Sequence, residues 1–202
     1  RPCNWPGGVL LIYLWVQDEL NVDQFHEKRN TLYQVMEKQQ AGNQTRVSYR
    51  TSGLVAETLK EDLPEVEHAT AVIESAWFPQ FILSSTNGSY EKAVGQFVGK
   101  EYFNIFSFDL IYGDENLVLA DKNSVVISEN LALKLFGQVD NVIGKTISLQ
   151  LADLKMERIV TGIFTGVPAN SSETFDFLLT FESYKDISPG VTNWGNNGTN
   201  VY

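Results

Sequence analysis

The sequence predicts an α+β fold that contains more strand than helix. Asn87-Gly88 separates two β-favouring segments, 81–85 and 90–98, as expected for a hairpin with a tight turn. Residues 128–136 repeat apolar side chains at helical spacing and are followed by a glycine. The 202 residues are 43% hydrophobic, which is enough to build a packed core.

The N-terminal region begins with an apolar run, residues 9–16, which stops at Gln17, Asp18 and Glu19. A membrane-spanning helix needs about 20 apolar residues, so this run of eight is too short by itself. The charged residues that follow it include no base, as on the outer side of a positive-inside helix. We therefore interpret residues 15–20 as the continuation of a helix that leaves a membrane. A short buried helix or strand of a soluble protein is the alternative.

The first third of the folded region has the pattern of a β-α-β unit. Asp23 is predicted to cap a short turn through His26. Strands are predicted at 31–37 and 46–50 around the turn 41–43, and a further strand-like segment at 66–78. Between them, Thr51 or Ser52 is predicted to cap a helix that Pro64 ends, with these apolar residues on one stripe: Leu54, Val55, Leu59 and Leu63.

The middle of the chain combines aromatic residues with a second helix. Four aromatic residues are spaced too densely to be solvated singly and predict a small core under a short helix: Tyr102, Phe103, Phe106 and Phe108. Ser128 is predicted to cap a helix that Gly137 ends. Its inward residues are Leu131, Leu135 and Phe136.

The last third is predicted to begin with another hairpin. Strands at 146–151 and 156–164 bracket a turn at 152–155. Residues 176–181 form one more apolar run, and the Gly/Asn-rich segment 193–200 is predicted to be a loop.

Composition excludes some classes of function. The net charge of -10 and pI near 4.6 argue against nucleic-acid binding, which requires a basic face. The single cysteine, Cys3, has no partner for an internal disulfide.

Five passages resemble one protein family. Residues 14–26 and 31–35 are similar to the passage "VQDEL..D.FH....LYQV" of bacterial ABC-transporter permeases of the MacB/FtsX type, especially the Bacteroidetes-like branch, where the first transmembrane helix enters the periplasmic core domain. Residues 123–137, residues 142–146, and residues 160–164 together with 167–171 match later passages of that domain in the same order.

The resemblance implies a two-lobed domain. Residues 1–29 would be the end of the first transmembrane helix and a connector, and 30–202 a MacB-like periplasmic core domain. A βαβ-type porter lobe would take 30–73 and 160–202, and an inserted β-rich sabre lobe 74–159. Further elements precede the second transmembrane helix in that family, so we expect the domain to continue beyond Tyr202.

The resemblance also implies function, partners and location. The domain would relay ATP-driven motion, or engage partners for export, from the periplasmic side of the inner membrane. Its partners would be a cytoplasmic ABC ATPase, reached through the membrane part of the parent chain, a second permease copy in a homodimer or permease pair, and a periplasmic adaptor. It implies no enzyme activity, and no catalytic, cofactor-binding or metal-binding residue.

Several motifs favour ordinary structure over chemistry. Gly144-Lys145-Thr146 lacks the first glycine of a phosphate loop, since Val139 occupies that position, and it precedes a strand rather than a helix. The two histidines, His26 and His68, have no ligand at a recognisable metal spacing. Ser52, Ser128 and Ser171 are interpreted as caps or turns, and solvated turns are predicted at Asp114, Asn116, Asp121 and Asn123.

Two other classes of function remain open from the sequence. An extracytoplasmic sensor would also follow a membrane helix, and would need a concave site with convergent polar groups. A glycan-active enzyme would use a pair of carboxylates, with Trp77 or Trp194 stacked on a sugar.

Overall fold

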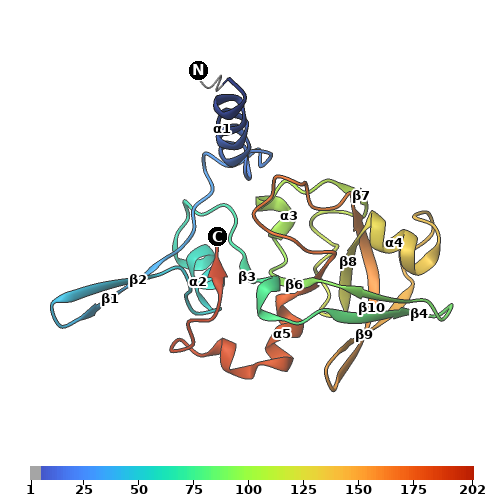
Figure 1. Ribbon diagram of the computed structural model, residues 1–202. Coiled ribbons are helices and arrows are strands. Elements are labelled where there is room, and N and C mark those ends of the chain that lie inside the picture. Colours follow the sequence, from blue (N-terminus) through green and yellow to red (C-terminus); the bar gives the residue numbers. More distant parts are fainter. Residues whose placement is uncertain (1–5) are drawn as a thin grey trace.

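The structure, a computed structural model, describes residues 6–202. Its first helix, α1 (Pro6–Leu20), stands away from the rest of the molecule (Figure 1), and its apolar side chains from Val9 to Val16 are exposed. None of the helices described is long and apolar enough to cross a membrane. Cys3 lies outside the described residues.

A β-hairpin follows residues 21–36 and extends away from the rest of the molecule (Figure 1). Strands β1 (Glu37–Ala41) and β2 (Gln44–Ser48) pair only with each other among the described residues, and their turn places Gly42 at φ +61°. The predicted turn is confirmed, but the predicted strand at 31–37 is wrong. Residues 32–36 form no regular strand. Within residues 6–202, only the Val35 amide of this segment pairs with another strand, donating to the Val201 carbonyl at 2.9 Å.

The next helix, α2 (Val55–Asp62), begins later than predicted. Thr51 and Ser52 do not cap it, because Thr51 pairs with Thr199 while the Ser52 hydroxyl accepts from the Leu54 amide and donates to the Asn193 carbonyl. The strand-like segment 66–78 contains only β3 (Ala71–Ile73) and a short 3-10 helix, η1 (Ser75–Trp77).

The remaining elements build one large sheet with few helices. Its strand order is β12-β3-β6-β11-β8-β10-β9-β4-β5, and β7 pairs with β10. The strands are β4 (Phe81–Ser85), β5 (Tyr90–Ala93), β6 (Gly95–Val98), β7 (Leu110–Tyr112), β8 (Ser124–Ser128), β9 (Thr146–Leu151), β10 (Leu154–Phe164), β11 (Phe177–Thr180) and β12 (Asn200–Val201). The helices are α3 (Tyr102–Ile105), α4 (Glu129–Phe136), α5 (Phe181–Ile187) and the 3-10 helix η2 (Pro189–Thr192).

The sheet curls back on itself at Val94. This single residue joins β5, the last strand in the order, to β6 near the other end. Asp176 fixes the junction, since its carboxylate accepts from the Val94 amide at 2.9 Å while its own amide donates to the Val94 carbonyl at 2.7 Å. At Gly95 a side chain is excluded, because a Cβ there would lie 2.2 Å from the Phe177 ring. The predicted hairpin around Asn87-Gly88 is confirmed for β4 and β5, whereas residues 95–98 pair elsewhere.

Helix α4 and the second hairpin agree with the sequence. The Ser128 hydroxyl accepts from the Leu131 amide at 3.2 Å, and Gly137 ends the helix at φ +71°. Leu131, Leu135 and Phe136 are buried. Strands β9 and β10 pair antiparallel around the predicted turn.

Two hydrophobic clusters fill the molecule. The larger lies inside the curled sheet and under α2, α4 and α5. The smaller contains the predicted aromatic residues Tyr102, Phe103 and Phe108 and is closed by Phe164 and Phe175. The predicted α+β class is confirmed. Strands from the predicted inserted lobe, residues 74–159, and strands from the residues on either side of it lie next to one another in the same sheet. The boundaries of the two lobes stay a prediction.

Candidate functional site

The connector that follows α1, residues 21–31, is fastened to the body on two sides. On one side it binds the loop 165–176 through three hydrogen bonds. The Asp23 amide donates to the Asn170 carbonyl at 2.9 Å, and the Asn170 side chain donates to the Asn21 carbonyl at 2.8 Å. The Ser172 amide donates to the Asp23 carboxylate at 2.9 Å. These contacts join residues that are about 150 positions apart in the chain.

On its other side the connector binds the end of α3 and the segment after it. The Ser107 amide donates to Nδ1 of His26 at 3.2 Å, and the Ser107 hydroxyl accepts from the Glu27 amide at 3.0 Å. Nζ of Lys28 donates to the Asn104 carbonyl at 2.7 Å. We call the two sets of contacts the clasp, defined by Asn21, Asp23, His26, Glu27 and Lys28 of the connector with Asn104, Ser107, Asn170 and Ser172 of the body.

Aromatic packing fills the space between the two sides of the clasp. His26 is 6% exposed. The centroid of its ring lies 4.0 Å from that of the Phe25 ring, 5.3 Å from that of Phe106 and 5.4 Å from that of Phe108. Phe108 in turn contacts Phe164 of β10. The connector is therefore in continuous contact with the main sheet.

The hydrogen bond at His26 defines its protonation state. Because Nδ1 accepts from an amide, the imidazole is neutral and carries its hydrogen on Nε2. Burial lowers the pKa of His26, and the nearby Asp23 carboxylate opposes this shift only partly.

Asp23 does not play the role that the sequence predicts. The sequence predicts that Asp23 caps its own turn, but its carboxylate accepts from the Ser172 amide, and its backbone has the left-handed φ of +56°. Such a conformation is uncommon outside glycine, although Asp tolerates it better than most residues. The cap prediction is wrong because a partner from the far end of the chain competes for the same oxygen.

A half-buried carboxyl group, that of Glu173, lies near the clasp. The Glu173 carboxylate accepts from the Gln96 side chain at 3.4 Å, and Gln96 also contacts the Tyr102 hydroxyl at 3.5 Å. Burial, together with the charges of Glu74 and Asp23, raises the pKa of Glu173 to about 6. This group is therefore held as an anion at neutral pH against an unfavourable environment.

An ion-pair cluster joins α2 to the start of α3. Glu101 is 8% exposed and accepts from Lys60, from His68 at 3.2 Å and from the Ala69 amide at 3.3 Å. Burial alone would raise the pKa of Glu101, but these contacts outweigh it and lower the pKa. The cluster braces residues 60–69 against the segment that carries half of the clasp.

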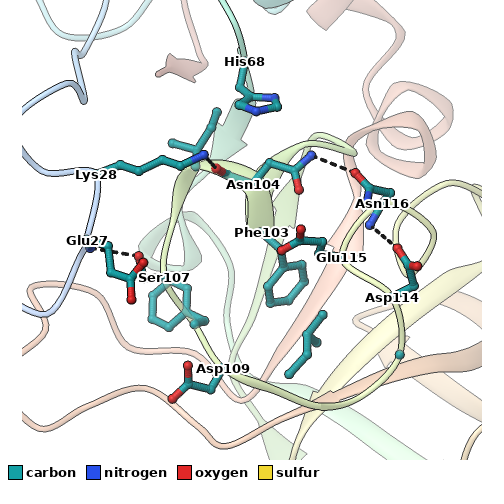
Figure 2. Close-up of a pocket in the computed structure, with 14 residues that line it drawn as sticks. Glu27, Lys28, His68, Phe103, Asn104, Ser107, Asp109, Asp114, Glu115 and Asn116 are labelled. Carbon is teal, nitrogen blue, oxygen red and sulfur yellow. Dashed lines mark hydrogen bonds between the residues drawn. The ribbon is translucent and has the colours of Figure 1, made fainter.

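A polar depression of about 700 Å³ lies beside the clasp (Figure 2). The connector contributes Glu27 and Lys28, and the segment after α3 contributes Asp109, Asp114 and Glu115. These five charged side chains are all exposed to solvent. Among residues 6–202 no three His, Cys, Asp or Glu side chains are grouped as a metal site would require.

The other residues singled out in the sequence lie apart from the clasp. Gly144, at φ +85°, forms a turn before β9, and the Lys145 ammonium lies 5.0 Å from the centre of the Phe136 ring. Asp114 and Asp121 accept from the amides of Asn116 and Asn123, which confirms the predicted turns.

The remaining candidates also have structural roles. The Ser171 hydroxyl accepts from the Glu173 amide. The Trp77 ring lies 4.4 Å from the Arg50 guanidinium, and Trp194 is exposed.

Comparison with known proteins identifies the family. The sequence model of a protein family, the MacB-like periplasmic core domain, matches residues 7–201. The chain belongs to this family. The predicted resemblance is thereby confirmed, and the match includes the connector, both sides of the clasp and the main sheet. A search of curated proteins finds no match.

Solved structures agree with this assignment of the MacB-like domain. A domain of a putative permease from Porphyromonas gingivalis is 26% identical with a TM-score of 0.62, over 77% of this chain and 68% of that one. The periplasmic region of MacB from Actinobacillus actinomycetemcomitans has the same fold at 16% identity and a TM-score of 0.51, over 75% of this chain and 64% of that one. The extracellular domain of the noncanonic ABC-type transporter YknZ from Gram-positive bacteria is 18% identical with a TM-score of 0.50, over 75% of this chain and 71% of that one.

Sequence reasoning missed the clasp. The polar residues of the clasp are of types that are common on protein surfaces, so their presence in the sequence gives no signal. Their hydrogen-bond partners are far away in the sequence and become neighbours only in the folded chain. One signal was available: the resemblance placed residues 14–26 where a membrane helix enters the domain, and the family passage shares Asp23 and His26.

Proposed function

We propose that this MacB-like domain is the periplasmic part of an ABC transporter permease in the inner membrane, and that it relays motion of the membrane helices to the outside. The family and the permease and transporter relatives support the context. The exposed apolar surface of α1 supports its continuation into a membrane, because exposed residues of this kind are costly in water.

The clasp is the observation that carries the relay. A displacement of α1 reaches the body only if the connector is stiff, and polar contacts on two sides of a buried aromatic ring provide that stiffness. A connector bound on one side would pivot. One bound on both sides moves the body with the helix.

The proposal assigns energy conversion to another subunit. The glycine spacing before Lys145 is wrong for a phosphate loop, so we expect ATP hydrolysis in a cytoplasmic ABC ATPase that contacts the membrane part of the parent chain. The domain itself would act without bond chemistry. Two permease copies and a periplasmic adaptor are its expected partners outside the membrane.

Displacement of the body relative to the bilayer tests the proposal. A donor dye on Glu157→Cys of β10, in a parent permease without other cysteines, reports energy transfer to acceptor headgroups of a nanodisc that contains the ATPase complex. We expect transfer to change when ATP and vanadate trap the complex. The Asp23→Ala variant should lose this change while hydrolysing ATP normally, and Asp18→Ala, at the exposed end of α1, should keep it.

The energy-transfer measurement and a deletion experiment together distinguish a relay domain from a sensor domain. No change of transfer in the unmodified complex would overturn the relay. Deletion of residues 30–202 should leave assembly with the ATPase intact and abolish transport or partner engagement. A sensor domain would instead show an altered ligand response with the flux preserved, and this result would replace our proposal.

A further inference from the structure

One hydrogen bond of the clasp is abolished by a single proton. Nδ1 of His26 accepts from the backbone amide of Ser107 at 3.2 Å. A backbone amide is always a donor, so no rotation at Ser107 can turn it into an acceptor. A proton on Nδ1 therefore places two N–H groups against each other, and the hydrogen bond becomes a repulsive contact.

The surroundings of His26 offer the protonated ring no new partner. It is enclosed by aromatic rings, and no carboxylate among residues 6–202 forms a hydrogen bond or an ion pair with it. Burial has the larger effect and lowers the pKa of His26, although the Asp23 charge opposes this shift. The ring therefore takes up a proton most readily when it leaves this position. The charged residues of the elements around it are Asp23, Glu27 and Lys28 of the connector, Asp109 after Phe108, and Glu173 of the loop 165–176.

Loss of the His26 contact also affects the residues that follow it. Figure 2 shows Glu27 and Lys28 on the same side of the clasp, where the Glu27 amide donates to the Ser107 hydroxyl. Ser107 thus takes part in two of the three hydrogen bonds on this side, so its displacement from His26 loosens both. The third bond, from the Lys28 ammonium to the Asn104 carbonyl, is exposed and depends on a flexible side chain.

The contacts on the loop side of the clasp withstand acid. Two of the three contain no titratable group, since the Asp23 amide donates to the Asn170 carbonyl and the Asn170 side chain donates to the Asn21 carbonyl. Acid also removes a charge beside them. Burial and the charges of Glu74 and Asp23 raise the pKa of Glu173 to about 6, so below this pH the Glu173 carboxyl group is neutral and no longer repels Asp23. The two sides of the clasp therefore respond to acid in opposite directions.

We propose that acid converts the clasp from a rigid joint into a hinge: protonation of His26 releases the connector from Ser107, while the contacts with the loop 165–176 remain and α1 pivots on them. The inference deepens the proposed function, on which it rests for its meaning, because a pivoting helix would no longer displace the body. The pH outside the membrane would then regulate the relay. The test uses no nucleotide and measures distances alone, so the hinge and the relay can fail separately.

Pulsed electron paramagnetic resonance on the full-length parent permease, in nanodiscs and without other cysteines, tests the hinge. One spin label is at Leu11→Cys of α1 and the other at Glu157→Cys of β10. Leu11 is exposed and lies more than three helical turns from Asp23, so a small rotation at the hinge moves it far. We expect a narrow distance distribution at pH 7.5, and a distribution at least twice as wide at pH 5.0.

Variants at position 26 assign the change to one side chain. His26→Asn keeps an acceptor oxygen near the place of Nδ1 but cannot take up the proton, so its distribution should be narrow at both pH values. His26→Leu removes the acceptor, so its distribution should be wide at both. His68→Asn changes the other histidine of the chain, which contacts Glu101 outside the clasp, and should respond to pH as the wild type does.

Two further label pairs separate a hinge from other effects of acid. Glu129→Cys of α4 with Glu157→Cys of β10 reports on the body, and Asp18→Cys of α1 with Thr174→Cys spans the loop side of the clasp. All four positions are exposed, and both distributions should stay narrow at pH 5.0.

Five results would overturn the proposal. They are an unchanged width in the wild type, acid broadening that persists in His26→Asn, a narrow distribution in His26→Leu, loss of the pH response in His68→Asn, and broadening of either control pair.

Discussion

The His26 ring accepts a hydrogen bond from the Ser107 amide, 3.2 Å from Nδ1, across 81 positions of the sequence. This bond exists only while the imidazole is neutral, because a protonated ring has donors at both nitrogens. It joins the segment that leaves α1 to the aromatic cluster of the body, so the stiffness of the clasp depends on the protonation of one side chain.

We expect acid to weaken the domain through His26. The unfolded imidazole takes up a proton near pH 6.5 and the folded one only at lower pH, since burial lowers its pKa. Between these two values the unfolded state binds more protons, so stability falls as pH falls through 6.5. The melting temperature from pH 7.5 to 5.5 should decrease less in His26→Gln than in the wild type. Parallel pH profiles would show that His26 is not the titrating group.

Glu173 should have the opposite pH dependence. Its folded pKa of about 6 is above its usual value of 4.5, so the stability that its protonated form contributes is lost as pH rises through 6. Glu173→Gln should therefore stabilise the domain at pH 7.5 by about 1 kcal/mol, after discounting for partial exposure, and the gain should vanish below pH 4.5. The exposed Glu65→Gln is the control. Denaturant unfolding that shows no gain at pH 7.5 would contradict the assignment.

Leu135 should be one of the costly positions in α4. Its side chain is fully buried, and truncation of a buried leucine costs about 2–5 kcal/mol. The matched control is Leu133→Ala in the same helix, where the side chain is 47% exposed. Chemical denaturation should therefore separate the two variants by more than 1 kcal/mol, and equal losses would place Leu135 outside the core.

The chain should not bind ATP at Gly144-Lys145-Thr146. The turn precedes strand β9 rather than a helix, so no helix N-terminus is presented to a phosphate. Titration calorimetry should detect no saturable binding, and Lys145→Ala should change nothing. Binding in the wild type that disappears in the variant would contradict this account.

The elements that sequence reasoning predicted correctly are defined by neighbours in the chain. Asn87-Gly88 permits a tight turn, and Ser128 and Gly137 mark the two ends of α4. The strand at 31–37 was wrong because bulky, β-favouring residues form a strand only when a partner pairs with them. Among the residues that the structure describes, this segment makes one hydrogen bond to another strand, from Val35 to Val201, and that partner lies about 165 positions further along the chain.

The curled sheet and the clasp could not be read from local patterns. Closure depends on Val94 passing the chain from one sheet edge to the other and on Asp176, 82 positions away, binding that junction. The clasp depends in the same way on Asn170 and Ser172 meeting the connector. Family resemblance located the connector, but its partners required the fold.

The central claim is that the clasp couples α1 rigidly to the body. Pulsed electron paramagnetic resonance between spin labels at Glu19→Cys of α1 and Glu157→Cys of β10 measures this coupling in the parent complex, with Cys3 replaced by serine. We predict one narrow distance distribution that is the same with and without trapped ATP, and a broad one when Asp23 and His26 are both replaced by alanine. A broad distribution in the unmodified clasp, or a narrow one in the double variant, would contradict the account.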